Sequence, residues 1–150
     1  LGADEAGMRL ALREAEAAAR ADEVPVGVVV LKDGDVAGRG RNRILETGDP
    51  TAHAEMLAIR SATKYLGERW LSGCTLFVTL EPCAMCAGAL VLARIHRLVF
   101  GASDPKTGAC GSLRNVVEDG RLNHQMGVQQ GVLAEESSWL LKQFFRVKRP

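Results

Sequence analysis

The residues that offer the most chemistry are a His-Ala-Glu triplet at 53–55 and a Pro-Cys-Ala-Met-Cys run at 82–86. His53, Cys83 and Cys86 are good zinc ligands, and Glu55 is a carboxylate that this ligand set does not need. A structural zinc site usually has four protein donors and no open position. Three donors with a spare carboxylate instead predict a zinc ion whose fourth position is open to water, with a base beside it. We therefore expect a catalytic site that binds one Zn²⁺ per subunit.

A site of this kind suits a hydrolysis that displaces an amine from an sp² carbon. Glu55 would take the proton of the attacking water and return it to the leaving amine, which typically contributes about 10²–10⁴-fold to the rate. Each motif alone is weak, because His-x-Glu is common and Cys-x-x-Cys is more often half of a structural zinc site or a redox pair. Their combination favours the catalytic interpretation.

Each motif is expected at the start of a helix. Thr51 could cap a helix that runs to about Leu66, and residues 83–94 are helical in composition. Residues two apart, such as His53 and Glu55, point to nearly opposite sides of a helix, so they share a site only beyond its N-terminal end. The positive ends of two helix dipoles would also favour the thiolate forms of Cys83 and Cys86.

The remaining periodicity predicts an α/β fold. Helices are expected at 1–21 and 135–147, and strands at 26–31, 36–40, 75–80, 98–101 and 128–133. The turn Asp33-Gly34 predicts that the first two strands pair antiparallel. The last three strands are separated by helices or long connections, so they are expected to be parallel. Together these elements predict a single domain, residues 1–150, with a three-layer α/β/α architecture and a five-stranded mixed sheet.

Composition sets the broad class. The chain has 150 residues, of which 47% are hydrophobic and 25% charged, as in ordinary globular domains. No apolar run reaches the roughly 18–20 residues that a membrane span needs, and the charged residues of the first helix argue against a secretory signal. Four unevenly spaced cysteines do not make a disulfide framework. We therefore expect a cytoplasmic protein that does not contact membranes.

The net charge of +1 conceals two basic groups. One group is formed by Arg39, Arg41 and Arg43, and the other lies in the last twelve residues, which contain no acid. Either group alone could be ordinary solvated surface. Two groups that flank the expected site favour a polyanionic substrate.

The motifs resemble those of the cytidine deaminase-like zinc deaminases, whose signature combines His-x-Glu with Pro-Cys-x-x-Cys. Within that superfamily the chain is most similar to the bacterial tRNA-specific adenosine deaminases, and the likeness runs from about residue 5 to 147. The segments that carry it are 24–27, 38–43, 49–55, 79–89, 99–102, 104–108, 111–113 and 122–124.

The resemblance implies a function and a partner. It implies hydrolytic deamination of adenosine to inosine at the wobble position of a tRNA anticodon, chiefly of arginine tRNA in bacteria. It also implies a homodimer that binds the anticodon stem-loop.

The resemblance also implies roles for particular residues. His53, Cys83 and Cys86 would bind zinc, and Glu55 would shuttle protons. The substrate contacts that it implies are Asn42 as a hydrogen-bond partner of the flipped purine nucleotide, Val26 as an apolar wall, Ala54 beside the nucleotide, Asp104 and Lys106 near neighbouring anticodon nucleotides, and Phe144, Phe145 and Arg146 on the anticodon loop.

Two alternatives stay open. A deaminase of free bases or nucleosides would share the zinc site and the fold, although the C-terminal basic residues and the 104–113 block speak against it. An RNA-binding module with a purely structural zinc is also physically reasonable, since zinc binding contributes about 10–16 kcal/mol in small finger domains. Such a module would have no need of Glu55.

Overall fold

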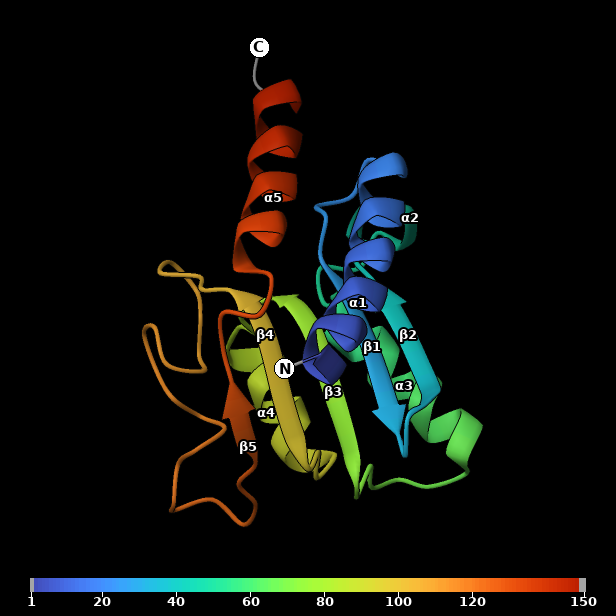
Figure 1. Cartoon of the computed structure of the whole chain (residues 1–150), viewed down its shortest axis with the longest axis vertical. Coiled ribbons are helices and arrows are strands. Elements are labelled where there is room, and N and C mark those ends of the chain that lie inside the picture. The colour runs from blue at the N-terminus through green and yellow to red at the C-terminus, as the bar shows by residue number, and fades with distance from the viewer. Residues whose placement is uncertain (1, 149–150) are drawn as a thin grey trace.

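A computed structural model describes residues 2–148 as a five-stranded sheet between two layers of helices (Figure 1). The elements are α1 (Gly2–Arg20), β1 (Gly27–Lys32), β2 (Asp35–Arg41), α2 (Ile44–Thr47), α3 (Ala54–Leu66), β3 (Cys74–Leu80), α4 (Ala84–Leu92), β4 (Arg97–Ala102), β5 (Gly127–Gln129) and α5 (Ala134–Lys148). In Figure 1, α1 lies in front of the sheet, α3 and α4 lie behind it, and α5 extends beyond the upper end of the sheet. α5 contacts α1 and β4. The predicted three-layer α/β/α architecture is confirmed.

The sheet is mixed, as expected. Its strand order is β2-β1-β3-β4-β5. β1 pairs antiparallel with both β2 and β3, whereas β3, β4 and β5 are parallel. Within residues 2–148, no helix has the length and apolar character to cross a lipid bilayer.

Alternation along the central strands divides the core into two parts. In β3, Leu76 and Val78 belong to the larger cluster, which lies under α3 and α4, while Phe77 joins the smaller cluster under α1. β1 and β4 alternate in the same way. Both faces of these strands are therefore buried, which explains their nearly continuous apolar sequences.

The parallel half of the sheet determines where chemistry can occur. β3 ends at Leu80, and α4 begins four residues later at Ala84. α3 packs against β1 and β2 and begins at the same edge of the sheet. In open α/β sheets this edge, where the carboxyl ends of the parallel strands meet, is the usual position of a ligand site.

Several predicted boundaries were wrong. Thr51 does not cap α3, because both its amide and its hydroxyl group donate to Asp49 Oδ1 in a local turn. The N-cap of α3 is His53. The helix predicted at 83–94 ends at Leu92. It does not continue, because Arg94, two residues later, adopts a left-handed conformation with φ of 58°.

Other segments also differ from expectation. The fifth strand is Gly127–Gln129 rather than 128–133, because Gly131 and Leu133 turn the chain with positive φ. Val132 and Leu133 still pack against the smaller core, which explains their apolar character. The loop expected after β2 contains the short helix α2. Leu1, where the first helix was predicted to begin, and the last two residues of the predicted domain lie outside the described residues.

A close approach of β2 to α3 fixes the position of the N-terminal end of α3. A methyl group on Gly40 would overlap the Ala54 carbonyl oxygen and lie 2.7 Å from the Ala58 nitrogen. We expect Gly40→Ala to lower the free energy of unfolding by about 1–3 kcal/mol, the usual cost of overpacking. Gly120→Ala is the matched control, since nothing lies within 4 Å of the added methyl group. Urea denaturation of both variants measures the effect, and equal midpoints would contradict it.

Candidate active site

Three possible metal ligands meet at the N-terminal ends of α3 and α4. His53 is the N-cap of α3, Cys83 is the N-cap of α4, and Cys86 lies in the first turn of α4. His53 Nδ1 is 3.7 Å from the Cys83 sulfur and 3.5 Å from the Cys86 sulfur. All three ligand atoms lie within 4.8 Å of one another. The sequence prediction that these residues come together is therefore confirmed.

The spacing of these atoms fits a tetrahedral zinc ion. Zinc–sulfur and zinc–nitrogen bonds of about 2.3 and 2.0–2.1 Å at a tetrahedral angle place the two ligand atoms about 3.6 Å apart. The observed separations of 3.5 and 3.7 Å lie on either side of that value. The donor set of two thiols and one imidazole is also one that zinc prefers.

The electrostatics of the cluster favour a cation. Hydrogen bonds from Cys86 and His53 lower the pKa of the Cys83 thiol to about 3. The hydrogen bond with Cys83 and burial raise the pKa of Cys86, so in the absence of a cation the second thiol resists ionisation. The hydrogen bond with Cys83 also raises the pKa of His53. A divalent cation would stabilise both thiolates and the neutral imidazole.

Glu55 lies in the first turn of α3, two residues after His53. Its side chain is only 4% exposed, and this burial raises its pKa to about 7. A carboxyl group whose pKa is near neutrality can both accept and release a proton. Such a shift on a group inside a cavity is typical of a catalytic acid or base.

A cavity of about 140 Å³, here called the central cavity, contains these groups. It is lined by Val24, Val26, Asn42, His53, Glu55, Leu80, Glu81, Cys83, Asp104 and Thr107. Val24, Val26 and Leu80 provide the apolar part of the wall, and the wall also contains ionisable groups: His53, Glu55, Glu81, Cys83 and Asp104. Val26, Asn42 and Asp104, three of the predicted substrate contacts, therefore lie at the cavity.

Asn42 has a fixed orientation. Its Oδ1 accepts a hydrogen bond of 2.9 Å from the Ala54 backbone N–H, at the N-terminal end of α3. Because an N–H needs an acceptor, this bond identifies the oxygen and leaves the amide nitrogen as a donor. Ala54 itself is fully buried and contributes its backbone to the site. The contact also aligns the start of α3, and so His53 and Glu55, with the end of β2.

The segment after β4 forms another part of the cavity wall. Asp104 Oδ1 accepts hydrogen bonds from the backbone N–H groups of Lys106 and Thr107, and Asp104 Oδ2 accepts one of 2.6 Å from the Thr107 hydroxyl. The Asp104 carboxylate thus holds its own turn. Lys106 is exposed on the outside of that turn and does not line the cavity.

A second pocket of about 310 Å³, here called the aromatic pocket, adjoins the central cavity. It is lined by Asp22, Glu23, Val24, Asn42, Ile44, Leu45, Phe144, Phe145 and Lys148. Val24 and Asn42 line both hollows. The rings of Phe144 and Phe145 meet edge to face, with centroids 5.4 Å apart. Arg146 is exposed on α5 and lines neither hollow.

Some residues at the site were not anticipated. Val24, Leu80, Glu81 and Thr107 line the central cavity; they lie in segments that carry the family resemblance, but no role was predicted for them. Glu23 is buried and accepts the backbone N–H groups of Leu45 and Glu46 at the start of α2, which forms one wall of the aromatic pocket. The signal in the sequence was a carboxylate next to a motif segment, as at Glu23 and Glu81. Their roles could not be predicted, because their hydrogen-bond partners lie 22 or more residues away in sequence.

Sequence comparisons agree with this geometry. A family model described as MafB19-like deaminase matches residues 3–149. The tRNA-specific adenosine deaminase of Bacillus subtilis is 48% identical over 97% of this chain and 91% of its own. The enzyme of the same name from Aquifex aeolicus is 46% identical over 95% of this chain and 93% of its own.

Solved structures give the same result. A tRNA:A34 deaminase, from work on A-to-I editing at the wobble position of transfer RNA, is 47% identical with a TM-score of 0.86 and covers 90% of this chain and 98% of its own. A guanine deaminase from Nitrosomonas europaea is 26% identical with a TM-score of 0.81 and covers 93% of this chain and 83% of its own. Identity is thus much higher to the tRNA deaminases than to this deaminase of a free base. The chain belongs to the family of tRNA-specific adenosine deaminases.

Proposed function

We propose that this protein hydrolyses adenosine to inosine at the wobble position of a tRNA anticodon, with arginine tRNA as its chief substrate. The observation that carries the proposal is the cluster of His53, Cys83 and Cys86 beside the buried Glu55. The high identity to tRNA-specific adenosine deaminases over almost the whole chain supports the choice of substrate. We also propose that residues 1–150 form a single deaminase domain that acts in the cytoplasm, where thiolate ligands stay reduced.

The reaction replaces a carbon–nitrogen bond with a carbon–oxygen bond. Water adds to C6 of adenine, the exocyclic amine leaves as ammonia, and C6 becomes the carbonyl carbon of inosine. His53, Cys83 and Cys86 would hold one zinc ion per chain. When bound, zinc supplies the Lewis acidity that lets water act as a nucleophile near neutral pH. Glu55 takes the proton of that water and delivers it to the departing amine.

The other cavity residues bind and orient the base. The target base must leave its stack to reach a buried site, and it enters the central cavity between apolar walls that include Val26. The Asn42 amide nitrogen donates to a ring nitrogen of the purine, for which N7 is a suitable acceptor. Ala54 supports this contact, because its backbone N–H fixes the orientation of the Asn42 amide.

Contacts to the flanking nucleotides would come from outside the central cavity. The aromatic pocket is close enough to share Val24 and Asn42 with it, and Phe144 and Phe145 offer surfaces on which a splayed base could stack. Lys106 and Arg146 are exposed cations that would contact phosphates. Asp104 would act through the turn that it holds beside the target base.

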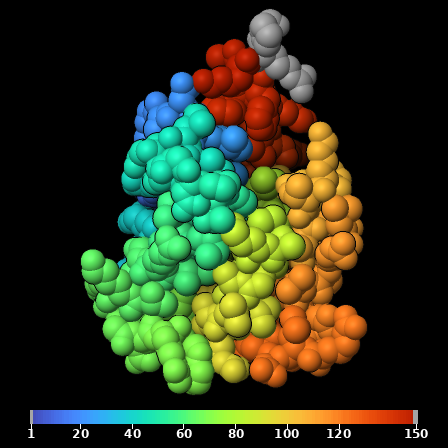
Figure 2. Space-filling model, turned by 180° about the vertical axis from the view of Figure 1, so that it is seen from behind, coloured from blue at the N-terminus to red at the C-terminus, as the bar shows by residue number. Residues whose placement is uncertain are grey.

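We also propose that two chains associate through α4. This helix is apolar around its whole circumference, yet Met85 is 36% and Leu92 is 79% exposed. Figure 2 shows α4 (yellow-green) at the surface, between α3 and the segment that follows β4. A helix without a polar face is expected to be covered on all sides, and a second copy of this surface is the simplest cover.

A substrate panel tests the proposed activity. We expect the zinc-loaded protein to form inosine at position 34 of an arginine-tRNA anticodon stem-loop, with kcat/KM at least about 100-fold above that for free adenosine, because flanking contacts add transition-state binding. Free guanine tests the activity of the more distant structural relative. A stem-loop of another tRNA with adenosine at position 34 tests the preference for arginine tRNA. Turnover of a free base or nucleoside without turnover of RNA would contradict the proposal.

A further inference from the structure

Glu81 is a buried carboxylate that follows β3 and precedes the Pro82-Cys83 segment. It is 3% exposed and has no ion-pair partner among residues 2–148. Its Oε1 accepts a hydrogen bond of 2.9 Å from the Asp104 backbone N–H and one from the Ser112 hydroxyl. Its Oε2 accepts bonds of 3.0 Å from the backbone N–H groups of Cys110 and Ser112. These four hydrogen bonds therefore stabilise the buried carboxylate in place of an ion pair.

This arrangement suits a carboxylate. All four groups that face the two oxygens of Glu81 are hydrogen-bond donors, and a carboxylate offers acceptors alone. A glutamine at this position would turn an NH₂ group toward N–H donors and leave buried polar groups unsatisfied. Glu81 therefore acts as a hydrogen-bond acceptor for this segment, and a side chain of the same size without two acceptor oxygens would not replace it.

The four bonds clamp both ends of one segment, residues 104–112. Cys83 also pairs with Gly108 in an isolated bridge, and the Ala109 N–H donates to the Pro82 carbonyl oxygen. A side chain on Gly108 would overlap the Glu81 carboxyl group, so the segment crosses directly over Glu81. The clamp fixes this part of the chain against the strand end that leads to a metal ligand.

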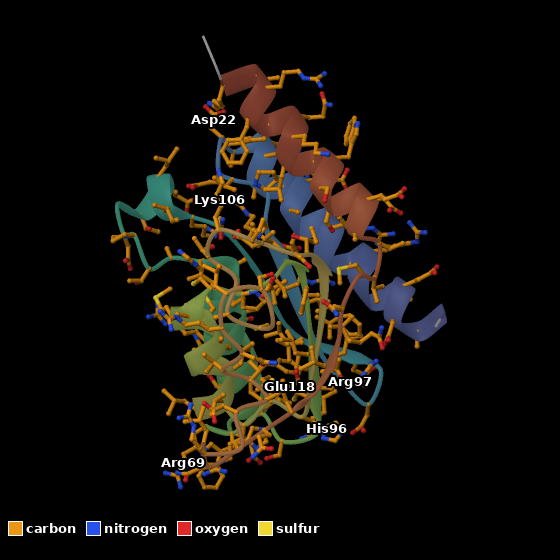
Figure 3. The ribbon with its side chains drawn as sticks, turned by 90° about the vertical axis from the view of Figure 1, so that its left-hand side faces the viewer. Asp22, Arg69, His96, Arg97, Lys106 and Glu118 are labelled. Carbon is orange, nitrogen blue, oxygen red and sulfur yellow. The ribbon has the colours of Figure 1, made fainter. Side chains whose placement is uncertain are left out.

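The clamped segment faces the proposed substrate. Asp104 and Thr107 line the central cavity, and Lys106 lies on the outside of the same turn. Figure 3 shows Lys106 toward the same end of the molecule as Asp22, a residue of the aromatic pocket, and far from Arg69 at the other end. The segment therefore lies where nucleotides beside the target base would pass.

We propose that Glu81 is a positioning residue that holds residues 104–112 in the conformation in which they contact the nucleotides flanking the target base. This inference rests on the proposed function. Glu81 does not act on the reacting atoms, because all four of its hydrogen bonds are made to residues 104–112. Its loss should weaken RNA binding more than it slows the chemical step.

Steady-state kinetics of zinc-loaded Glu81→Gln on the anticodon stem-loop tests the inference. We expect KM to rise at least about tenfold, as when one hydrogen bond to a charged group is lost, while kcat stays within about threefold and zinc content is unchanged. Glu118→Gln is the matched control. The Glu118 carboxylate is exposed, its hydrogen-bond partner within residues 2–148 is the Asn115 side-chain amide, and Glu118 lies outside both hollows. It should leave KM and kcat unchanged.

A double-mutant cycle with Lys106→Ala separates positioning from simple stabilisation. If Glu81 acts through the segment, the two KM effects should be less than additive, whereas additive effects would overturn the inference. It would also be overturned by an unchanged KM with only a lower unfolding midpoint, or by loss of zinc, which would indicate action through Cys83.

If Glu81→Gln does not fold, Ser112→Ala tests the inference in its place. This variant removes one donor to the same carboxylate and should raise KM about threefold. An unchanged KM in that variant would overturn the inference. Absence of stem-loop turnover by the unaltered protein would instead refute the proposed function.

Discussion

Replacing Glu55 with glutamine should lower kcat on the stem-loop by about two to four orders of magnitude, the range attributed to general acid–base catalysis. Three carboxylates line the central cavity: Glu55, Glu81 and Asp104. Glu81 is held by four donors, and Asp104 holds its own turn. Only Glu55 remains for proton transfer. Its pKa, which burial raises to about 7, suits that role.

The measurement needs a readout of folding and of metal binding alongside activity. Glutamine preserves the shape of the side chain, so zinc content and the unfolding midpoint should stay close to those of the unaltered protein. Glu55→Ala should also lose kcat while its zinc content and its unfolding midpoint stay close to those of the unaltered protein. Turnover within about threefold of the original would remove Glu55 from the mechanism.

The central part of the fold could be predicted from local sequence patterns. The apolar runs at Val28–Val30 and Leu76–Val78 predicted the buried strands, because successive side chains of each strand enter two opposite core clusters. The metal ligands were also predictable, because the spacing of Cys83 and Cys86 and the helix starts constrain where they point. These features depend on residues that are close in sequence.

The errors arose where distant residues decide the outcome. Thr51 is a good N-cap by residue type, but its backbone N–H donates to Asp49. The side-chain acceptor for the first N–H group of α3 comes instead from Asn42, twelve residues earlier in the sequence. The end of β5 depends on positive φ angles at Gly131 and Leu133, and Leu133 is not a residue type that predicts one. The hydrogen bonds of Glu81 span 23 to 31 residues. No pattern within one segment reveals such contacts.

Removing one metal ligand should have the second large effect. In Cys83→Ser a hydroxyl group replaces the thiol whose pKa is lowered to about 3. Because an alcohol does not ionise near neutral pH and oxygen is a poorer zinc donor than thiolate sulfur, we expect zinc affinity to fall by more than about 100-fold, beyond the 10–100-fold typical of outer-shell changes. Stem-loop turnover should fall with it.

The other cysteines provide the control for that result. Cys74 is fully buried at the start of β3 and is not one of the clustered ligands, so Cys74→Ala should keep one zinc ion per chain. Competition with a chromophoric chelator measures zinc affinity in both variants, and elemental analysis after dialysis measures stoichiometry. Equal zinc content in Cys83→Ser and in the unaltered protein would contradict the ligand assignment. Loss of zinc from Cys83→Ser alone would tie the metal to the helix ends where His53 and Cys86 also lie, which is the arrangement on which the proposed hydrolysis depends.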